Sequence, residues 1–279
     1  MGKLKKSKLL IHLFVIAVGF AMVYPLLWMV SSSFKPSNEI FTTKDFFPKI
    51  FTLENYAIGW KGFSGYTFGR FFLNSFFVTG MCVIGTVISS TMAAYAFSKL
   101  KFTFKNGFFS IMMLTLMLPT HVILIPQYII FSKLEWINTY LPIIVPKCFG
   151  VQAFFIFLLV QYMRGLPEEI FESARMDGCG VISIYLRLIL PLSVPAIVTT
   201  AILTFMWTWN DFFSQLLYLN RVDKFTIAIA LRMFVDTTGG SSWGAMFAMS
   251  VLSLVPLFMV FVFFQKYIVD GITTGAVKG

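Results

Sequence analysis

Charged residues are scarce in this chain of 279 residues: they make up 12% of it, while hydrophobic residues make up 58%. A typical soluble domain carries about twice that share of charge. The mean hydropathy is +0.82, and a soluble fold of this length would have too few polar side chains to cover its surface. The composition therefore indicates an integral membrane protein.

Residues that build catalytic and metal sites are also few. The three cysteines, Cys82, Cys148 and Cys179, show no paired spacing, and the histidines His12 and His121 stand alone in apolar surroundings, so no metal site is expected. The sequence has no phosphate-binding loop of the G-x-x-x-x-G-K-[ST] type, no metal-protease spacing and no nucleophile elbow. The chain is therefore expected to bind no cofactor, to have no catalytic residue and not to hydrolyse ATP itself.

Six apolar runs are long enough to cross a membrane as helices, the form that leaves no backbone group unpaired in lipid. They are Leu9–Val30, Phe71–Ser98, Gly107–Phe131, about Asn138–Met163, about Leu192–Phe213 and about Gly244–Phe264. The first follows a lysine-rich start and is too long for a cleaved signal peptide, so it is predicted to be an uncleaved anchor. The sequence thus predicts an all-α integral membrane protein with six transmembrane helices.

Basic residues near the ends of these runs predict the orientation. The net charge is +10, and because lysines and arginines cluster beside apolar runs, membrane topology explains them better than a nucleic-acid partner does. Lysines precede the first run, and Lys99, Lys101 and Lys105 lie in the short connection between the second and the third. Short basic loops stay in the cytoplasm. Both termini are therefore predicted to be cytoplasmic, N-in and C-in.

Prolines interrupt several of the runs. Each proline frees a backbone carbonyl and bends or ends a helix. Bent helices of this kind are tolerated in ordinary bundles, but their number favours a transporter whose helices line a cavity. Pro119 and Pro126 interrupt the third run and Pro256 the sixth, whereas Pro142 and Pro146 open the fourth run and Pro195 lies early in the fifth.

Residues 166–191, between the fourth and fifth runs, form a polar loop in an otherwise apolar sequence. Pro167 and the carboxylates of Glu168, Glu169 and Glu172 suit the first turns of a helix. Glycines at positions 178 and 180 end that helix, a second is expected over Val181–Leu190, and the proline at 191 marks a bend. The residues alone leave open whether this platform merely covers the end of the bundle or binds a partner.

Part of this loop resembles a family signature. The segment Glu172-Ser173-Ala174-Arg175-Met176-Asp177-Gly178, followed by Leu188-Ile189-Leu190-Pro191, resembles the E-A-A-x-x-x-G…I-x-L-P loop of permease subunits in binding-protein-dependent ABC importers. Ser173, Cys179 and Leu188 are small or apolar departures from it. The pairs Asn74-Ser75 and Trp209-Asn210 and the sequence after Gln265 extend the resemblance to the whole chain. They resemble the carbohydrate-uptake branch, in particular the smaller permease of maltose-type systems.

The resemblance implies that loop 164–191 is a cytoplasmic coupling helix that docks on an ATPase subunit. The residues implied to couple are Glu168, Glu169, Glu172, Ser173, Ala174, Asp177 and Gly178. It also implies a second permease in a heterodimer, two ATPase subunits that bind ATP and Mg, an extracytoplasmic substrate-binding protein, and the plasma membrane of a prokaryote. Residues 1–31 would be the anchor, 32–70 an extracytoplasmic segment, 71–266 the permease core and 267–279 a cytoplasmic tail.

Polar side chains inside apolar runs need a partner or a function. Aromatic faces with amide and carboxylate groups suit sugars, although tryptophans also mark membrane interfaces. Lys147 is expected to snorkel to the surface rather than to face a cavity. The candidates for a substrate pathway are Asn74, Gln127, Trp207, Trp209, Asn210 and Asp211, with Ser75 and Gln152 as further polar positions.

Two other function classes compete with an importer permease for a carbohydrate. A secondary transporter would be expected to show internal repeats and ionisable residues at mid-membrane, and neither is evident in the sequence. A membrane enzyme would need a catalytic constellation, which the sequence lacks. Within the importer class, glycerol phosphate or another polyol derivative stays open as an alternative cargo.

Overall fold

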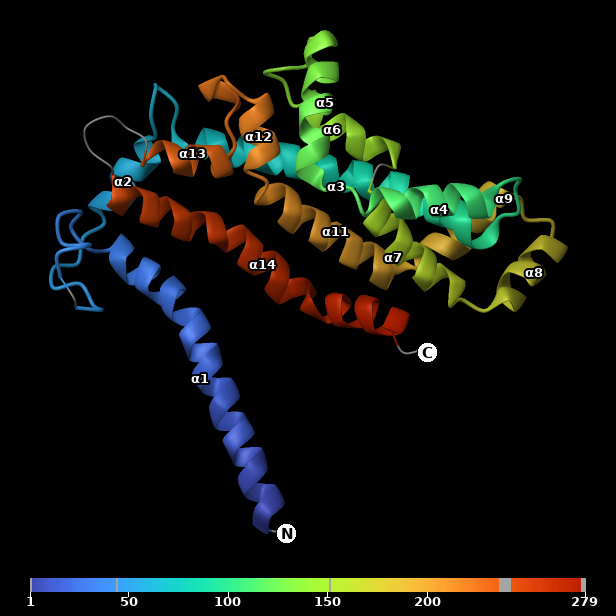
Figure 1. The fold of residues 1–279 in the computed structure, drawn as a ribbon, viewed down its shortest axis with the longest axis horizontal. Helices are drawn as coiled ribbons and strands as arrows, with labels where there is room; N and C mark the ends of the chain where they lie inside the picture. The colour runs from blue at the N-terminus through green and yellow to red at the C-terminus, as the bar shows by residue number, and fades with distance from the viewer. Residues whose placement is uncertain (1, 44, 151, 236–241, 277–279) are drawn as a thin grey trace. The chain divides into compact units, whose positions relative to one another are not determined.

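The structure is a computed structural model, and it describes residues 2–43, 45–150, 152–235 and 242–276. The side chains of residues 2–7, 9–10, 120–121 and 268–276 lie outside this description, and with them those of His121 and most of the N-terminal lysines. Regular secondary structure in the described part is helical throughout (Figure 1). This confirms the predicted all-α class.

Two compact units make up the chain. The first comprises residues 1–69 and 230–255, and the second comprises residues 70–229 and 256–279. This division follows packing, whereas the predicted division at residues 31, 70 and 266 follows the sides of a membrane and stays a prediction.

Four stretches among the described residues are long and apolar enough to cross a membrane. They are Ile11–Ser33 of α1 (Gly2–Ser33), α3 (Phe68–Lys99), Leu141–Arg164, and Trp243–Tyr267 of α14 (Trp243–Ala276). A bent pair, Val181–Leu192 with Val194–Trp209, supplies a fifth candidate. Five of the six predicted runs therefore have a counterpart by length and composition.

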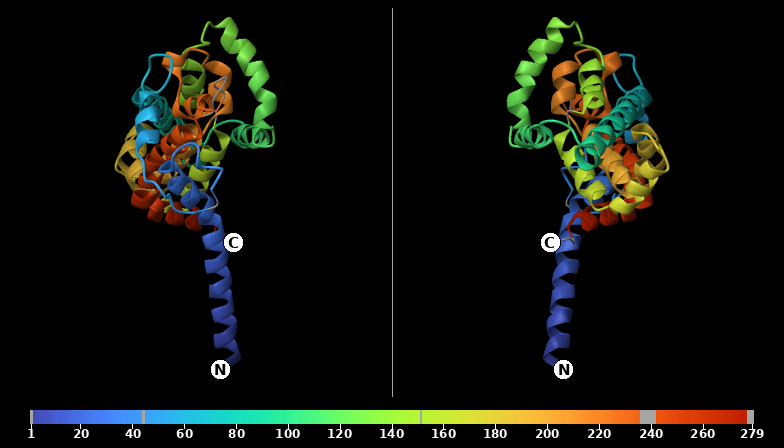
Figure 2. Two further views of the ribbon diagram at one scale, coloured as in Figure 1. Left: turned by 90° about the vertical axis from the view of Figure 1, so that its left-hand side faces the viewer. Right: turned by 90° about the vertical axis from the view of Figure 1, so that its right-hand side faces the viewer.

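The third predicted run, Gly107–Phe131, is not one continuous helix. It divides into α4 (Lys105–Thr115) and α5 (Thr120–Lys133), which run in different directions on either side of the break (Figure 2). Pro119 has an extended backbone, with φ −60° and ψ 125°. A proline restricts the residue before it to extended conformations and lacks an N–H, so α4 cannot continue through it.

Other predicted interruptions do not occur. Pro126 lies inside α5 and Pro256 inside α14, and both helices continue past them. A proline removes one backbone hydrogen bond. The carbonyl that it leaves free can be satisfied by neighbouring helices or side chains, so the helix can continue. The fourth run is instead divided at Gly150, which has φ +68°. Before it lie α6 (Leu141–Ile144) and the 3₁₀ segment η1 (Val145–Phe149), and after it lies α7 (Ala153–Arg164).

In the first unit, α1 exposes its apolar side chains over most of its length, as a helix in lipid would. The short helix α2 (Glu54–Lys61) fixes the segment that follows α1. Its Asn55 is 3% exposed, and its amide nitrogen donates hydrogen bonds to the carbonyls of Ser33 (2.9 Å) and Lys35 (2.7 Å). Close packing continues at Gly59, where an added Cβ would lie 2.7 Å from the side chain of Met249.

The second unit has a hydrophobic core where the ends of α3, α7 and α11 (Val194–Trp209) meet the loop 164–191. Further helices of this unit are α12 (Phe213–Tyr218) and the first residues of α13 (Ile227–Met233). The buried members of the core are Ala94, Tyr95, Ile156, Leu159, Val160, Met163, Phe171, Ala174, Ile184, Ile189 and Ala196. The polar loop is thus packed on one side against the helices that it connects.

Candidate functional site

The first helix of the loop, α8 (Glu168–Met176), is amphipathic over little more than two turns. Pro167 occupies the N-cap position instead of the first helical position predicted for it, and Glu168 and Glu169 lie in the first turn. Carboxylates there complement the positive end of the helix dipole. Phe171 is fully buried and Ala174 is 9% exposed, so residues three apart carry the packed face.

The end of α8 is a Schellman motif centred on Gly178. Its N–H donates to the carbonyl of Arg175 (3.0 Å), and the N–H of Cys179 donates to the carbonyl of Ala174 (2.9 Å). This pairing places the residue after the helix in the left-handed region, where glycine is favoured. Gly178 has φ +78°, and no atom lies within 4 Å of the position that a Cβ would take. The glycine is therefore required by the backbone and faces open space.

The second helix of the loop contains a π-helical segment, where one continuous α-helix was predicted. The expected helix over Val181–Leu190 is observed as α9 (Val181–Ile184), a π-helical segment (Tyr185–Ile189) and α10 (Leu190–Leu192). A 76° bend separates it from α11. The predicted bend at Pro191 therefore lies close to the observed break, which falls at Ser193.

Tyrosines fasten α9 and the π segment to α3. The Tyr95 hydroxyl donates to the carbonyl of Val181 (3.2 Å), and the Tyr185 hydroxyl lies 2.7 Å from the Thr91 hydroxyl. The rings of Tyr95 and Tyr185 stack with their centroids 5.5 Å apart. The second half of the loop is thus held on α3 by two hydrogen bonds and a ring contact.

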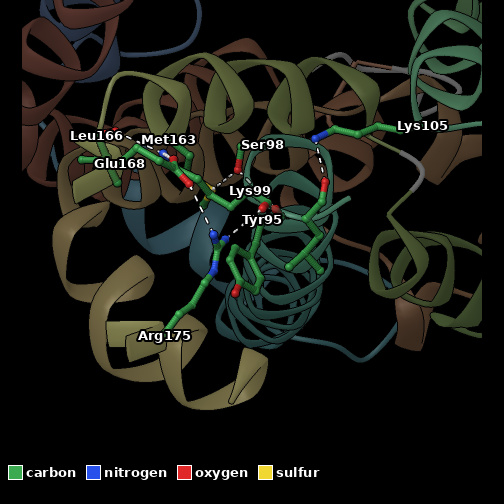
Figure 3. Close-up of polar contacts among 9 residues, drawn as sticks. Tyr95, Ser98, Lys99, Lys105, Met163, Leu166, Glu168 and Arg175 are labelled. Carbon is green, nitrogen blue, oxygen red and sulfur yellow. Dashed lines mark hydrogen bonds and ion pairs between the residues drawn. The ribbon is translucent and has the colours of Figure 1, made fainter. Parts of the chain in front are cut away.

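Lys99, the last residue of α3, fastens α8 to the same helix (Figure 3). Its side chain is 5% exposed and donates hydrogen bonds to a carboxylate oxygen of Glu168 (2.8 Å) and to the carbonyl of Leu166 (3.1 Å). The ammonium lies 4.4 Å from the centre of the Phe171 ring. Arg175 closes the network, with a nitrogen 3.8 Å from the other Glu168 oxygen and a hydrogen bond to the carbonyl of Lys99 (3.5 Å).

This network keeps Glu168 charged. The hydrogen bond from Lys99 holds the pKa of the Glu168 carboxyl below its ordinary value of 4.5 and outweighs the partial burial that acts in the opposite direction. Glu168 itself is half exposed. The pair therefore stabilises the fold mainly by giving the buried Lys99 ammonium a partner.

The predicted coupling residues fall into two groups. Glu169, Glu172, Ser173, Asp177 and Gly178 are exposed. Ala174 is buried against its own chain, and Glu168 is engaged by Lys99 and Arg175.

Apolar side chains that the prediction did not single out surround the exposed group. Met176 is 89% exposed and Ile182 is 74% exposed. Both side chains expose apolar surface on the loop 164–191.

The predicted substrate-pathway residues do not form one cluster. Asn74 is 6% exposed, and its amide nitrogen donates to the carbonyls of Asp223 (3.0 Å) and Phe225 (2.8 Å), while the Ser75 hydroxyl accepts the N–H of Ile227 (2.8 Å). These two side chains therefore fasten α3 to the segment before α13.

The tryptophans at the end of α11 point to different surroundings. Trp209 is 3% exposed and contacts the rings of Phe72, Phe76 and Phe205, whereas Trp207 is 50% exposed. Residues two apart on a helix do not share a face. Asn210 is exposed and donates to a carbonyl of its own helix, so the candidates from Trp207 to Asn210 do not share one surface.

Two of the candidates, Gln127 and Asp211, line a common cavity of about 140 Å³ in the second unit. Gln152 and Lys147 line it as well. Lys147 therefore lines a cavity, and the expected snorkelling of its ammonium stays a prediction. Tyr218, which the sequence did not single out, also lines the cavity. An amphipathic tyrosine in an aromatic-rich segment carries no signal that separates it from an ordinary core residue.

Both the sequence and the fold match known proteins. Residues 85–274 match the family described as "Binding-protein-dependent transport system inner membrane component". The chain is 37% identical over 270 residues to a probable ABC transporter permease protein of Bacillus subtilis, covering 96% of this chain and 88% of that one.

A second relative, from Halalkalibacterium halodurans, is an arabinooligosaccharides transport system permease protein. It is 34% identical over 283 residues, with 99% and 100% of the two chains covered. Among solved structures, a bacterial ABC transporter involved in the import of the acidic polysaccharide alginate matches with a TM-score of 0.84 and 21% identity, over 94% of this chain and 96% of that one. At this identity the structural match concerns the fold alone.

Proposed function

Because this chain belongs to the binding-protein-dependent transport system inner membrane components, we propose that it is one permease subunit of an ATP-driven importer. It would form half of a translocation pathway for an oligosaccharide or related sugar and work by alternating access. The family is one of transport subunits in the inner membrane, not of enzymes.

The observation that carries the proposal is the loop 164–191. It offers exposed carboxylates and exposed apolar side chains at its surface, while its opposite side is fastened to the end of α3 by Lys99 and Tyr95. A partner that grips such a loop moves α3 with it. This supports a mechanical role for the loop, in which partner subunits bind ATP and Mg and hydrolyse the nucleotide.

The exposed group of the loop is the proposed contact with the ATPase subunit. Glu169, Glu172 and Asp177 would pair with basic groups, and Met176 and Ile182 would fill an apolar groove. Glu168 and Ala174 would act from within, by setting the position of α8. We propose a heterodimer with a second permease, two ATPase subunits and an extracytoplasmic substrate-binding protein.

The proposed topology has six crossings, with both termini in the cytoplasm. α4 and α5 together would make the third crossing as a broken span, and α9 to α11 would lead into the fifth. The basic residues 99, 101 and 105 support this orientation, because they lie in a short connection.

A carbohydrate is the proposed cargo because the relative in Halalkalibacterium halodurans carries arabinooligosaccharide transport in its name. Uptake of labelled arabino-oligosaccharides, maltose and glycerol phosphate by cells with and without this subunit tests the proposal. We expect loss of uptake of a sugar when the subunit is removed. Loss of glycerol phosphate uptake alone would show that the cargo is a polyol phosphate and not a sugar. Unchanged uptake of all three compounds would contradict the proposal.

Binding of the ATPase tests the loop itself. Met176→Glu places a charge on the exposed apolar surface of the loop, and the ATPase is expected to be lost when the complex is purified in detergent. Phe104→Glu is the matched control, because Phe104 is 78% exposed on another connection. Equal retention of the ATPase by both variants would contradict the docking assignment.

A further inference from the structure

The segment that follows α1 folds back along that helix. The ring of Phe46 lies 5.7 Å from the ring of Tyr24, and the ring of Phe41 lies 6.3 Å from that of Trp28, measured between centroids. Tyr24 precedes the last residue of α1 by nine residues, so the segment reaches back about 13 Å along the helix at 1.5 Å per residue. Both contacts on α1 therefore fall inside the apolar stretch Ile11–Ser33.

Side chains at the end of α1 hold this fold-back in place. The Lys35 ammonium donates to the carbonyl of Asp45, and the Ser31 hydroxyl donates to the carbonyl of Phe46. Lys35 is 1% exposed, so its ammonium is withdrawn from solvent to bond a backbone carbonyl. In water, the carbonyls of an irregular segment can bond to the solvent, whereas in lipid they need partners within the protein. The contacts of Lys35 and Ser31 meet that need.

Apolar side chains of the same segment stay exposed. Phe47 is 76% exposed and Phe51 is 64% exposed. Both line an open groove of about 470 Å³, whose other lining residues include Leu27 and Val30 of α1. These two residues also belong to the exposed apolar side chains of α1. The apolar surface of the segment is thus continuous with that of a helix long and apolar enough to cross a membrane.

The chemistry of this surface selects lipid as its partner. The chain is an inner membrane component, and the outward surface of a spanning helix meets acyl chains. Aromatic and apolar side chains are favoured at the boundary between headgroups and acyl chains. The charged residues Asp45 and Lys49 form a 3.0 Å ion pair and are more than half exposed, which suits the polar headgroup layer. Lipid would cover the surface at all times, whereas a soluble partner would cover it only while bound.

We propose that residues 45–51 form an interfacial collar on α1, with Phe46, Phe47 and Phe51 inserted at the boundary between lipid headgroups and acyl chains. The collar anchors the segment after α1 in the membrane surface and fixes the depth at which α1 crosses. The proposal requires that α1 crosses the membrane, and it does not depend on the cargo or on the ATPase.

Photo-crosslinking in the complete transporter tests this contact, in nanodiscs of phosphatidylethanolamine and phosphatidylglycerol. Phe47→benzoylphenylalanine keeps an aromatic ring at an exposed position of the collar, and Ile50→benzoylphenylalanine, at a position 61% exposed, is a second variant if the first disturbs the fold. Irradiation is expected to add one phospholipid covalently to this chain, which mass spectrometry detects. Phe14→benzoylphenylalanine, on the exposed surface of α1, is the reference for a residue in lipid.

The matched control is Tyr66→benzoylphenylalanine. Tyr66 is an exposed aromatic residue of the same unit. It lies in a tight turn after α2, where its N–H donates to the carbonyl of Phe63 and its carbonyl accepts the N–H of Phe63. This turn lies outside the folded-back segment, and we expect the lipid adduct to be lost at this position.

Three outcomes overturn the collar. They are lipid adducts at Phe14 with none at Phe47 or Ile50, adducts of Phe47 with another protein in place of lipid, and equal yields of lipid adduct at Tyr66 and Phe47. A lack of lipid adducts at all four positions, Phe14 included, would remove the premise that α1 lies in lipid and would overturn the collar as well. Sugar uptake by the unsubstituted transporter is measured separately, so the proposed function is judged independently of these results.

Discussion

Lys99 is the last residue of α3, and its ammonium donates a 2.8 Å hydrogen bond to the carboxylate of Glu168, the first residue of α8. Sixty-nine residues separate the two in the sequence. The lysine is buried and the glutamate is half exposed, so the pair connects the end of a long apolar helix to the short polar helix of the loop. A displacement of α8 therefore acts directly on the end of α3.

Lys99→Met should weaken this connection without unfolding the membrane helices, because the methionine keeps the apolar stem and its contact with Phe171. We expect the amount of sugar transported per ATP hydrolysed to fall at least about fivefold. This fold-change corresponds to about 1 kcal/mol, the lower end of usual coupling free energies. Uptake and ATPase rates in proteoliposomes give this ratio. Lys101→Met is the control, since Lys101 is exposed and close by; an equal fall in both variants would rule out a specific role for Lys99.

Glu168 should give α8 a pH dependence of known sign. Its pKa lies below the ordinary 4.5 in the folded chain, so the carboxylate contributes stability that is present above that ordinary value. The contribution is lost as the pH falls through the lower, folded pKa. Because the carboxylate is half exposed, it amounts to no more than about 1 kcal/mol.

Melting temperatures of the wild type and of Glu168→Gln between pH 7 and pH 3 measure this effect. The wild type is expected to melt higher at pH 7, and the two curves should meet at the acid end. A difference that persists undiminished at pH 3 would show that ionisation of Glu168 is not its origin.

Gly178→Val should block uptake while the membrane part stays folded. A side chain at φ +78° is strained, by about 1–2 kcal/mol for most residues and more for a β-branched one, and it would project into open space where a partner would bind. Gly180→Ala is the control, because Gly180 has φ −72° and nothing within 4 Å of an added Cβ. Normal uptake at a normal ATPase rate in Gly178→Val would contradict the coupling assignment of this loop.

Asn74→Leu should destabilise the second unit. Both hydrogens of its amide are donated to carbonyls, and the substitution leaves the buried carbonyl of Phe225 and the partly buried carbonyl of Asp223 unpaired. A buried acceptor left unpaired costs about 1–3 kcal/mol. Asn210→Leu is the matched control, since that exposed side chain bonds only to its own helix, and its change should stay within about 0.5 kcal/mol. Thermal unfolding in detergent compares them. A stable Asn74→Leu protein that has lost sugar binding would instead support the predicted pathway role.

The sequence predicted the helical class, five of six apolar runs and the polar loop, because these follow from composition and from local glycine and proline chemistry. The break at Pro119 was predicted on the same grounds. Pro126 and Pro256 have the same local chemistry, yet their helices continue. Whether a proline ends a helix depends on what satisfies the freed carbonyl, and that is decided by neighbours distant in the chain.

The candidate site was predictable only in part for a related reason. Exposure of Glu169, Glu172 and Asp177 follows from an amphipathic pattern, but the burial of Ala174 and the pairing of Glu168 depend on where α3 ends. Likewise, no local pattern tells that Gln127 and Asp211 share a cavity, or that Trp207 and Trp209 do not share a patch.

The π-helical turn at Tyr185–Ile189 holds one residue more than an α-helical turn would. Each residue rotates an α-helix by about 100°, so adding one more residue here would rotate Leu190 and all of α11 out of register with the tyrosine contacts on α3. A deletion of one residue is easier to accommodate, because it turns the wide π turn into an ordinary α-helical one. This stretch is therefore more sensitive to an inserted residue than to a deleted one.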